Sequence, residues 1–224
     1  MEKQTENIIH TTALDAGDFD TWLAGTKATQ LDGEDADVPC GNCNACCKSF
    51  YFIHITAEDV GALKAIPKEL LVQAPSLPTG HFVMGYTEHG HCPMLVNERC
   101  SIYSDRPQTC RAYDCRIFAA AEMQPGERDK ALVSQQTANW AFSYTTPEAR
   151  ATQKAIARAA NWLTSEREND NSYLPDEFLP SNSTQLAVLA LQLRELFGAD
   201  VGKTELSSPE HVEACVKLIA PSMM

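Results

Sequence analysis

Short apolar runs, broken by glycine, proline and polar residues, mark the first half of the chain and predict strands. Aromatic and β-branched residues dominate these runs, as is typical of buried strands. The runs cover residues 49–55, 81–86 and 93–96. Residues 97–98 predict a tight turn after the last of them. We therefore expect a small antiparallel sheet in this part of the chain.

Helix signals lie between and after these runs. Thr56 and Asp59 form a near match to a capping box, which opens a helix over residues 57–66. Pro107 suits the first turn of a second, short helix that carries Cys110. The sheet is therefore expected to alternate with short helices.

The second half of the chain is rich in alanine and predicts longer helices. Thr146 and Pro147 begin the first, Ser183 or Thr184 begins the second, and Pro209 begins the third. These helices are predicted over residues 147–166, 185–197 and 209–220, the last ending before Pro221. The fold class is therefore α+β: a small antiparallel sheet with a cysteine-metal cluster, followed by a mainly helical C-terminal half.

Charge divides the chain further. The 224 residues carry a formal net charge of -12, which argues against nucleic acid or an anionic membrane as the main partner. Nine acidic residues and two lysines fall within residues 1–37, which predicts an acidic arm, folded or disordered, with a short helix around Phe19 and Trp22. We expect this arm, a cysteine-cluster domain over residues 38–117, and a helical extension over residues 118–224 packed on it.

Targeting signals do not mark this sequence. No apolar run approaches the roughly 20 residues of a membrane helix, and the N-terminus lacks the basic start and apolar block of a secretory signal. We therefore expect a cytoplasmic protein. Cysteines in that compartment stay reduced, so clustered ones are expected to be metal ligands or redox groups rather than disulfides.

Eight of the nine cysteines gather in one third of the chain. A CxxC turn brings two thiolates within reach of one ion, and a second group of cysteines follows about 45 residues later. The predicted metal ligands are Cys40, Cys43, Cys46, Cys47, Cys92, Cys100, Cys110 and Cys115. The ninth, Cys215, lies on one helical face with Val212, Val216 and Ile219, so we interpret it as a core residue.

The number of ligands leaves several arrangements open. A closed zinc site or a 4Fe-4S cluster takes four thiolates, so eight cysteines fill two sites, or one site with spare thiols. Cys46 and Cys47 are adjacent, and in extended backbone their side chains point to opposite faces. This predicts that one of them serves a second site or stays beside the first site without binding its metal. His89 and His91 are alternative ligands. Arg106 and Arg111 are expected to contact the cofactor, because guanidinium donors stabilise a net negative thiolate site.

The cysteine pattern resembles the YkgJ-like CxxCxxCC cysteine-cluster family, whose members are described as zinc- or iron-chelating. The matching residues lie between 38 and 117, and they are Cys40, Cys43, Cys46, Cys47, Cys92, Pro93, Cys100, Tyr103, Arg106, Pro107, Cys110, Arg111 and Cys115. The resemblance implies zinc or iron-sulfur binding at the cysteines and names no substrate. A related motif in flagellin lysine methylases suggests methyl transfer by family analogy alone.

Several enzyme classes do not fit the spacing. The radical-SAM pattern CxxxCxxC and the ferredoxin pattern CxxCxxCxxxCP are both absent, and no glycine-rich nucleotide fingerprint follows a strand. The sequence therefore predicts a cytosolic metal-binding protein that holds zinc or an iron-sulfur cluster through thiolates. The alternatives are an iron-sulfur oxidoreductase or electron-transfer protein and, more weakly, a relative of protein-lysine methylases. Whether the chain is an enzyme and which protein it meets are left open.

Overall fold

The computed structural model describes residues 13–32, 34–73, 77–126, 128–202 and 206–223. Its strands are β1 (Leu14–Asp18), β2 (Ile53–Ile55), β3 (Phe82–Met84), β4 (Leu95–Val96), β5 (Arg99–Cys100) and β6 (Trp140–Ser143). Its helices are α1 (Phe19–Asp32), α2 (Val60–Ala65), α3 (Gln108–Arg111), α4 (Arg116–Ala120), α5 (Ala131–Thr137), α6 (Pro147–Glu168), α7 (Ser183–Leu193) and α9 (Pro209–Met223). Short 3-10 turns include η1 (Ala45–Lys48), η3 (Tyr103–Asp105), η4 (Arg128–Lys130) and η6 (Arg194–Leu196), with η2 (Lys68–Leu70) and η5 (Asp176–Phe178) in loops.

The strands pair two by two, which confirms the α+β class with small antiparallel sheets. Ile53 of β2 lies opposite Met84 of β3. Leu95 of β4 lies opposite Cys100 of β5, across a turn at Asn97 and Glu98 that has positive φ angles. The predicted single sheet is thus divided into two antiparallel ladders. The third ladder, β1 with β6, is parallel and was not predicted, because its strands lie far apart in the sequence.

The long helices begin close to where the sequence places them. Thr146 caps α6, since its Oγ1 accepts a hydrogen bond from the N–H of Ala149 at 3.0 Å. Asn182 caps α7, so the helix begins at Ser183. The predicted end of the last helix before Pro221 is wrong, because α9 continues through Pro221 to Met223.

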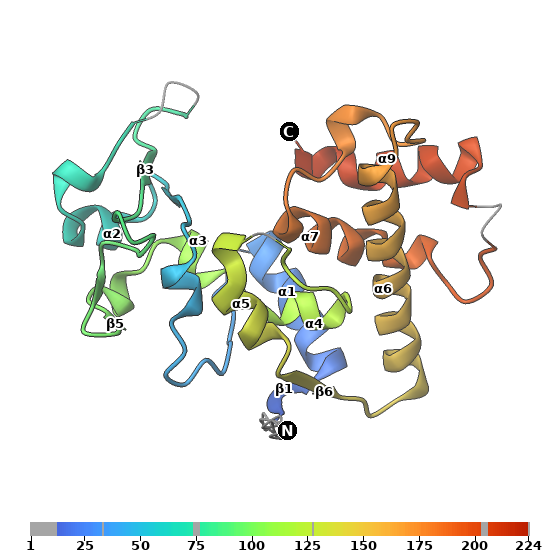
Figure 1. The fold of residues 1–224 in the computed structure, drawn as a ribbon, viewed down its shortest axis with the longest axis horizontal. Coiled ribbons are helices and arrows are strands. Elements are labelled where there is room, and N and C mark those ends of the chain that lie inside the picture. The colour runs from blue at the N-terminus through green and yellow to red at the C-terminus, as the bar shows by residue number, and fades with distance from the viewer. Residues whose placement is uncertain (1–12, 33, 74–76, 127, 203–205, 224) are drawn as a thin grey trace, which may run out of the picture.

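Two hydrophobic cores divide the molecule into lobes. The larger core joins α1, α4, α6, α7 and α9, with Phe118, Leu163 and Leu193 among its fully buried side chains. The smaller core lies around Ile55 and Met84, between β2, β3 and α2. Figure 1 shows these two lobes at opposite ends, with α3 and α5 between them.

The N-terminal segment belongs to the larger core from residue 13 onward. The short helix predicted around Phe19 and Trp22 is confirmed as part of α1, and both of these side chains are buried. β1 before it pairs with β6. Residues 1–12 of the predicted acidic arm lie outside the described residues. No helix in the described part of the chain has the length and apolar character needed to span a bilayer.

Candidate metal centre

Local structure places the eight clustered cysteines on rigid supports. Cys40 and Cys43 lie in the turn that leads into η1, and η1 itself carries Cys46 and Cys47. The others lie beside β4, in β5, in α3 and at the start of α4, and they are Cys92, Cys100, Cys110 and Cys115. All eight are free thiols.

Hydrogen bonds bring the later cysteines back to η1. The N–H of Cys92 donates to the carbonyl of Cys47 at 2.7 Å. The amide of Asn44 donates to the carbonyl of Glu98 at 3.1 Å, and Lys48 forms an ion pair with the same glutamate. The tight turn between β4 and β5 therefore folds against η1, which carries Cys100 towards the first cysteine turn.

Seven of the eight cysteines face one large cavity at the junction of the lobes, which we call the seam cavity. Its volume is about 1230 Å³, and Cys115 is the one clustered cysteine that does not line it. Its other wall comes from the first turns of α7. A second, smaller cavity of about 280 Å³ lies against Cys40, Cys43, Cys46, Cys110 and Cys115. The two cavities share four of these cysteines, so the thiols form one continuous cluster.

Electrostatic coupling separates the cluster into two groups. Burial raises the pKa of Cys110 to about 12, and the charges of Cys46, Cys92 and Cys100 raise it further. Burial also raises the pKa of Cys92, with contributions from Cys100 and Cys46. We call Cys46, Cys92, Cys100 and Cys110 the first thiol group.

The remaining coupled cysteines lie around Cys115. Burial raises the pKa of Cys115 to about 12, and the charges of Cys40 and Cys43 act in the same direction. Burial is likewise the main cause that raises the pKa of Cys40 to about 11, and the charges of Cys46 and Cys43 raise it as well. We call Cys40, Cys43 and Cys115 the second thiol group, and Cys46 connects it electrostatically to the first.

The adjacent pair Cys46 and Cys47 departs from the sequence expectation. Their backbone forms a 3-10 turn rather than an extended segment, so the argument that their side chains point to opposite faces is wrong. A hydrogen bond with the Cys47 side chain, then burial, raises the pKa of Cys46. Cys46 is exposed by surface area because it faces the cavity, yet the surrounding protein still desolvates its sulfur.

The donor set fits a thiophilic metal in its chemistry. Thiolates packed together repel one another, and burial disfavours each of them, so their deprotonation calls for a cation. Four thiolates are the ligand complement of a structural zinc or a 4Fe-4S cluster. Among the described residues, no three Cys, His, Asp or Glu side chains are already gathered tightly enough to share one ion. Binding of a metal would therefore require the sulfurs to move closer together.

The two predicted arginines are placed differently. Arg106 lines both cavities, its charge lowers the pKa of Cys110, and its Nε is buried without a hydrogen-bond partner among the described residues. Arg111 lines only the smaller cavity. Its guanidinium contacts Asp35 at 3.0 Å and Gln108 at 2.5 Å. Arg106 is thus the better placed of the two to meet a bound group.

The alternative ligands lie outside the cluster. The side chain of His89 is 76% exposed and contacts Glu88 at 3.5 Å. His91 packs near it, with ring centroids 6.4 Å apart, and neither histidine lines either cavity. Cys215 is fully buried in the larger core beside Ile219, which confirms its interpretation as a core residue.

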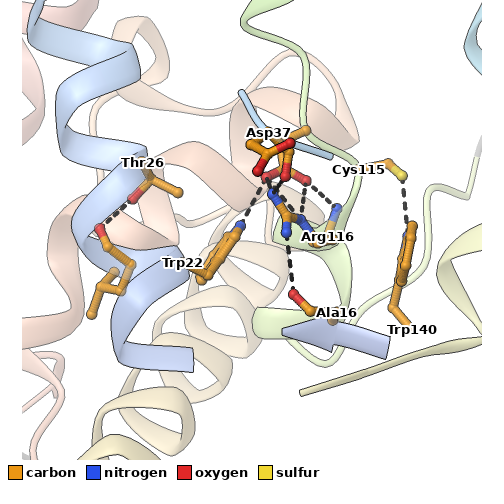
Figure 2. A network of polar contacts seen from close by, with 9 residues as sticks. Ala16, Trp22, Thr26, Asp37, Cys115, Arg116 and Trp140 are labelled. Atoms are coloured by element: carbon orange, nitrogen blue, oxygen red, sulfur yellow. Dashed lines mark hydrogen bonds and ion pairs between the residues drawn. The ribbon is translucent and has the colours of Figure 1, made fainter. Parts of the chain in front are cut away.

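A buried polar network fixes the backbone on both sides of Cys115. Figure 2 shows Arg116 between the N-terminal segment and the cysteine segment. Its guanidinium pairs with Asp114 at 2.8 Å and donates to the carbonyls of Ala16 and Asp37. Trp140 donates its indole N–H to the sulfur of Cys115 at 3.3 Å. The sulfur of Cys115 is therefore held from behind by a donor that stabilises its thiolate.

Three residues of the seam cavity could not be predicted from the sequence. Tyr51 and Tyr113 meet with their hydroxyl oxygens 3.1 Å apart, and Lys130 approaches the Tyr51 ring. Burial raises the pKa of Tyr113 well above its usual value. These residues come from three separate segments, and no local motif marks any of them.

Comparison with known proteins places the cysteine segment in a family. Residues 39–139 match the family model CxxCxxCC, described as a "putative zinc- or iron-chelating domain". No curated protein and no solved structure matches the chain. The match covers all eight clustered cysteines, and it extends through α5 to the residue before β6. Residues 39–139 of this chain are therefore similar to the CxxCxxCC domains, for which that description stands.

Proposed function

We propose that this protein binds zinc or an iron-sulfur cluster through the first thiol group, as a metal centre that faces the seam cavity. The observation that carries the proposal is the convergence of Cys46, Cys92, Cys100 and Cys110 on one cavity wall. They come from η1, a loop, β5 and α3, so the fold rather than a single turn brings them together. Four thiolates satisfy either kind of centre.

The residues around this group support a bound cation. Arg106 adds a guanidinium beside Cys110, which offsets part of the negative charge of a four-thiolate site. The hydrogen bond between the side chains of Cys46 and Cys47 raises the pKa of Cys46, so this thiol stays protonated until a metal displaces its proton. When bound, zinc would supply a Lewis acid and an iron-sulfur cluster would supply one-electron chemistry. The chain's own role is to hold the four sulfurs and to shield them on the protein side.

The second thiol group supports a further, weaker metal position. Cys40, Cys43 and Cys115 provide three thiolates, one fewer than a closed zinc site requires. Trp140 donates to one of them. We therefore assign the tighter metal to the first thiol group.

Electron transfer is the second candidate function. Cys40 and Cys46 are exposed to the cavity, whereas the sulfurs of a purely structural site are closed off. A cluster held there would be reachable by an electron partner. Thiolates that hold a metal must stay reduced, so a reducing compartment such as the cytosol suits this function.

Single cysteine substitutions test the assignment. Cys110→Ser and Cys92→Ser should each lower the metal retained after gel filtration to below half of the wild-type value, because a three-thiolate site binds less tightly. Cys215→Ala, a buried cysteine outside the cluster, is the matched control and should retain all of it. Elemental analysis measures the result. Full metal retention in both cluster variants would contradict the assignment.

A further inference from the structure

We infer that the seam cavity binds a small organic anion, a carboxylate or phosphate attached to an apolar body, between the thiol cluster and the start of α7. The volume of about 1230 Å³ exceeds the roughly 300–1,000 Å³ of ordinary small-molecule pockets. It has room for a metal centre on one wall and an organic molecule beside it. The position next to the metal rests on the proposed function, whereas the anion site itself is built from other residues.

Lys130 supplies the positive charge of the anion site. It ends η4, lines the seam cavity, and is only 6% exposed. Its Nζ donates to the hydroxyl of Ser183 at 3.3 Å and lies 5.4 Å from the centre of the Tyr51 ring. An ammonium buried in a cavity wall acts at low effective dielectric, so it attracts an anion more strongly than a surface lysine does.

Two tyrosines add neutral donors beside this lysine. The hydroxyls of Tyr51 and Tyr113 lie 3.1 Å apart, and both residues line the seam cavity. A phenol is protonated at neutral pH, so it can donate a hydrogen bond. The pair therefore presents a phenolic donor to the cavity, as an oxyanion requires.

The N-terminal end of α7 also favours an anion in the seam cavity. Thr184 and Gln185 line the cavity in the first turn of this 11-residue helix. Thr184 Oγ1 is buried without a hydrogen-bond partner among the described residues. The N-terminal end of a helix carries partial positive charge and favours anions. This helix end adds to the charge of Lys130, which stands at the same wall.

Outside the thiol cluster, the charged side chains that line the cavity are mostly positive and favour an anion. Arg99, Arg106 and Lys130 line it, and Glu98 is the single carboxylate among its lining residues. That carboxylate pairs with Lys48. These positive side chains are a local departure from the net charge of -12 of the whole chain.

An apolar body is expected on the ligand because aromatic and aliphatic side chains form much of the remaining wall. Phe50, Phe52, Val188 and Leu189 line the cavity, and Phe52 is 65% exposed. Phe50 adopts a positive φ of 53°. Such strain in a bulky residue costs about 1–3 kcal/mol and is concentrated at ligand sites. Here it turns an aromatic ring towards the cavity.

Binding of two simple anions to the purified full chain tests this inference. The probes are phenyl phosphate and benzoate, with benzyl alcohol as the neutral analogue, and isothermal titration calorimetry measures each dissociation constant. We expect at least one anion to bind with a dissociation constant below about 1 mM, and benzyl alcohol to bind at least tenfold more weakly. The better of the two anions identifies whether phosphate or carboxylate is preferred.

Substitutions locate the site. Lys130→Met should weaken binding of the preferred anion at least tenfold, and Tyr51→Phe about threefold. Lys154→Met removes a charge from an exposed position of α6 and should leave binding unchanged. Tyr51→Phe and Thr184→Val carry the test if Lys130→Met does not fold, since each removes only one hydroxyl or replaces it by a methyl group.

Three results would overturn the inference: binding of neither anion, equal binding of benzyl alcohol, or unchanged affinity in both the Lys130→Met and the Tyr51→Phe variant. Metal content is measured on the same samples. Anion binding to protein that holds no metal would contradict the metal centre and leave the anion site standing. Metal binding without anion binding would contradict the anion site and leave the metal centre standing.

Discussion

Cysteine ionisation is the residue property on which the metal centre depends. Cys40, Cys110 and Cys115 have pKa values raised to between about 11 and about 12, chiefly by burial. At neutral pH these thiols are protonated until a metal displaces the protons. Metal uptake by the metal-free protein should therefore release protons, and the affinity should rise with pH.

The stability of the metal-free protein should fall at alkaline pH. In the unfolded chain the thiols ionise near pH 9, whereas Cys110 and Cys115 ionise at about pH 12 in the folded protein. A folded pKa above the unfolded value stabilises the fold below pH 9, and this contribution is lost as the pH rises from 9 towards 12. Urea unfolding at pH 8, 9.5 and 11 measures the effect.

A variant isolates the contribution of one thiol to this loss. Cys110→Ala should make the decline in unfolding free energy between pH 9 and 11 shallower, because it removes one of the groups that titrate. Equal slopes in the variant and the wild type would contradict the assigned ionisation.

The segment from η1 to β4 is the element that presents the cysteines. Phe50 follows η1 in the left-handed region, and its N–H donates to the carbonyl of Gly90 at 3.0 Å. Gly90 has a φ of 76°, and a Cβ built on it would lie 2.3 Å from the Phe50 ring. The lack of a side chain at Gly90 therefore allows the ring to lie directly against the loop before Cys92.

Substitution at Gly90 should destabilise this element. Gly90→Ala meets both the unfavourable φ and the Phe50 ring, so we expect a loss of about 2–3 kcal/mol in unfolding free energy. Gly126→Ala, at a position with open space around its Cβ, is the control and should change stability by less than about 0.5 kcal/mol. A Gly90→Ala protein as stable as the control would show that the ring and the loop are not held together.

Local signals in the sequence predicted some elements better than others. Thr146 with Pro147 and the apolar face around Cys215 act over a few residues, so α6 and the position of Cys215 followed from the sequence. The β1–β6 ladder did not, because Leu14 and Trp140 lie far apart in the chain and no turn connects their strands. The strand predicted over residues 49–55 is also shorter, since η1 and the strained Phe50 precede β2.

The whole molecule is tied together by the buried pair of Asp114 and Arg116. Their side chains are 11% and 10% exposed. Arg116 reaches β1 through Ala16 and the segment before the first cysteine through Asp37, and Trp22 of α1 donates to Asp114 at 2.9 Å. The N-terminal segment is thereby attached to the backbone that carries Cys115.

Removal of the Asp114 carboxylate from this pair should lower the free energy of unfolding. Asp114→Ala leaves the Arg116 guanidinium buried without its carboxylate, so we expect a loss of about 3–5 kcal/mol in unfolding free energy. Glu195→Ala, which removes a 79% exposed partner of Arg194, is the control and should have little effect. Thermal and urea unfolding measure both variants. Equal effects of the two substitutions would show that the network does not fix the N-terminal segment to the backbone that carries Cys115.

The sequence predicted one side of the site and missed the other. The cysteines are visible because close spacing of thiols has few causes other than metal binding. Tyr51, Tyr113 and Lys130 are ordinary residues in separate segments, and only the packing of α5 and α7 against the cysteine segment brings them to one cavity. The extended backbone assumed for Cys46 and Cys47 is wrong for a local reason, the 3-10 turn at η1.

Metal content per chain tests the central claim most directly. The protein would be purified without air, and its metals would be counted by elemental analysis together with its visible spectrum. We expect either one to two zincs per chain without colour, or about four irons with broad absorption at roughly 400 nm. Protein that carries neither metal, takes up neither on addition, and leaves all eight clustered thiols freely titratable would contradict the metal centre.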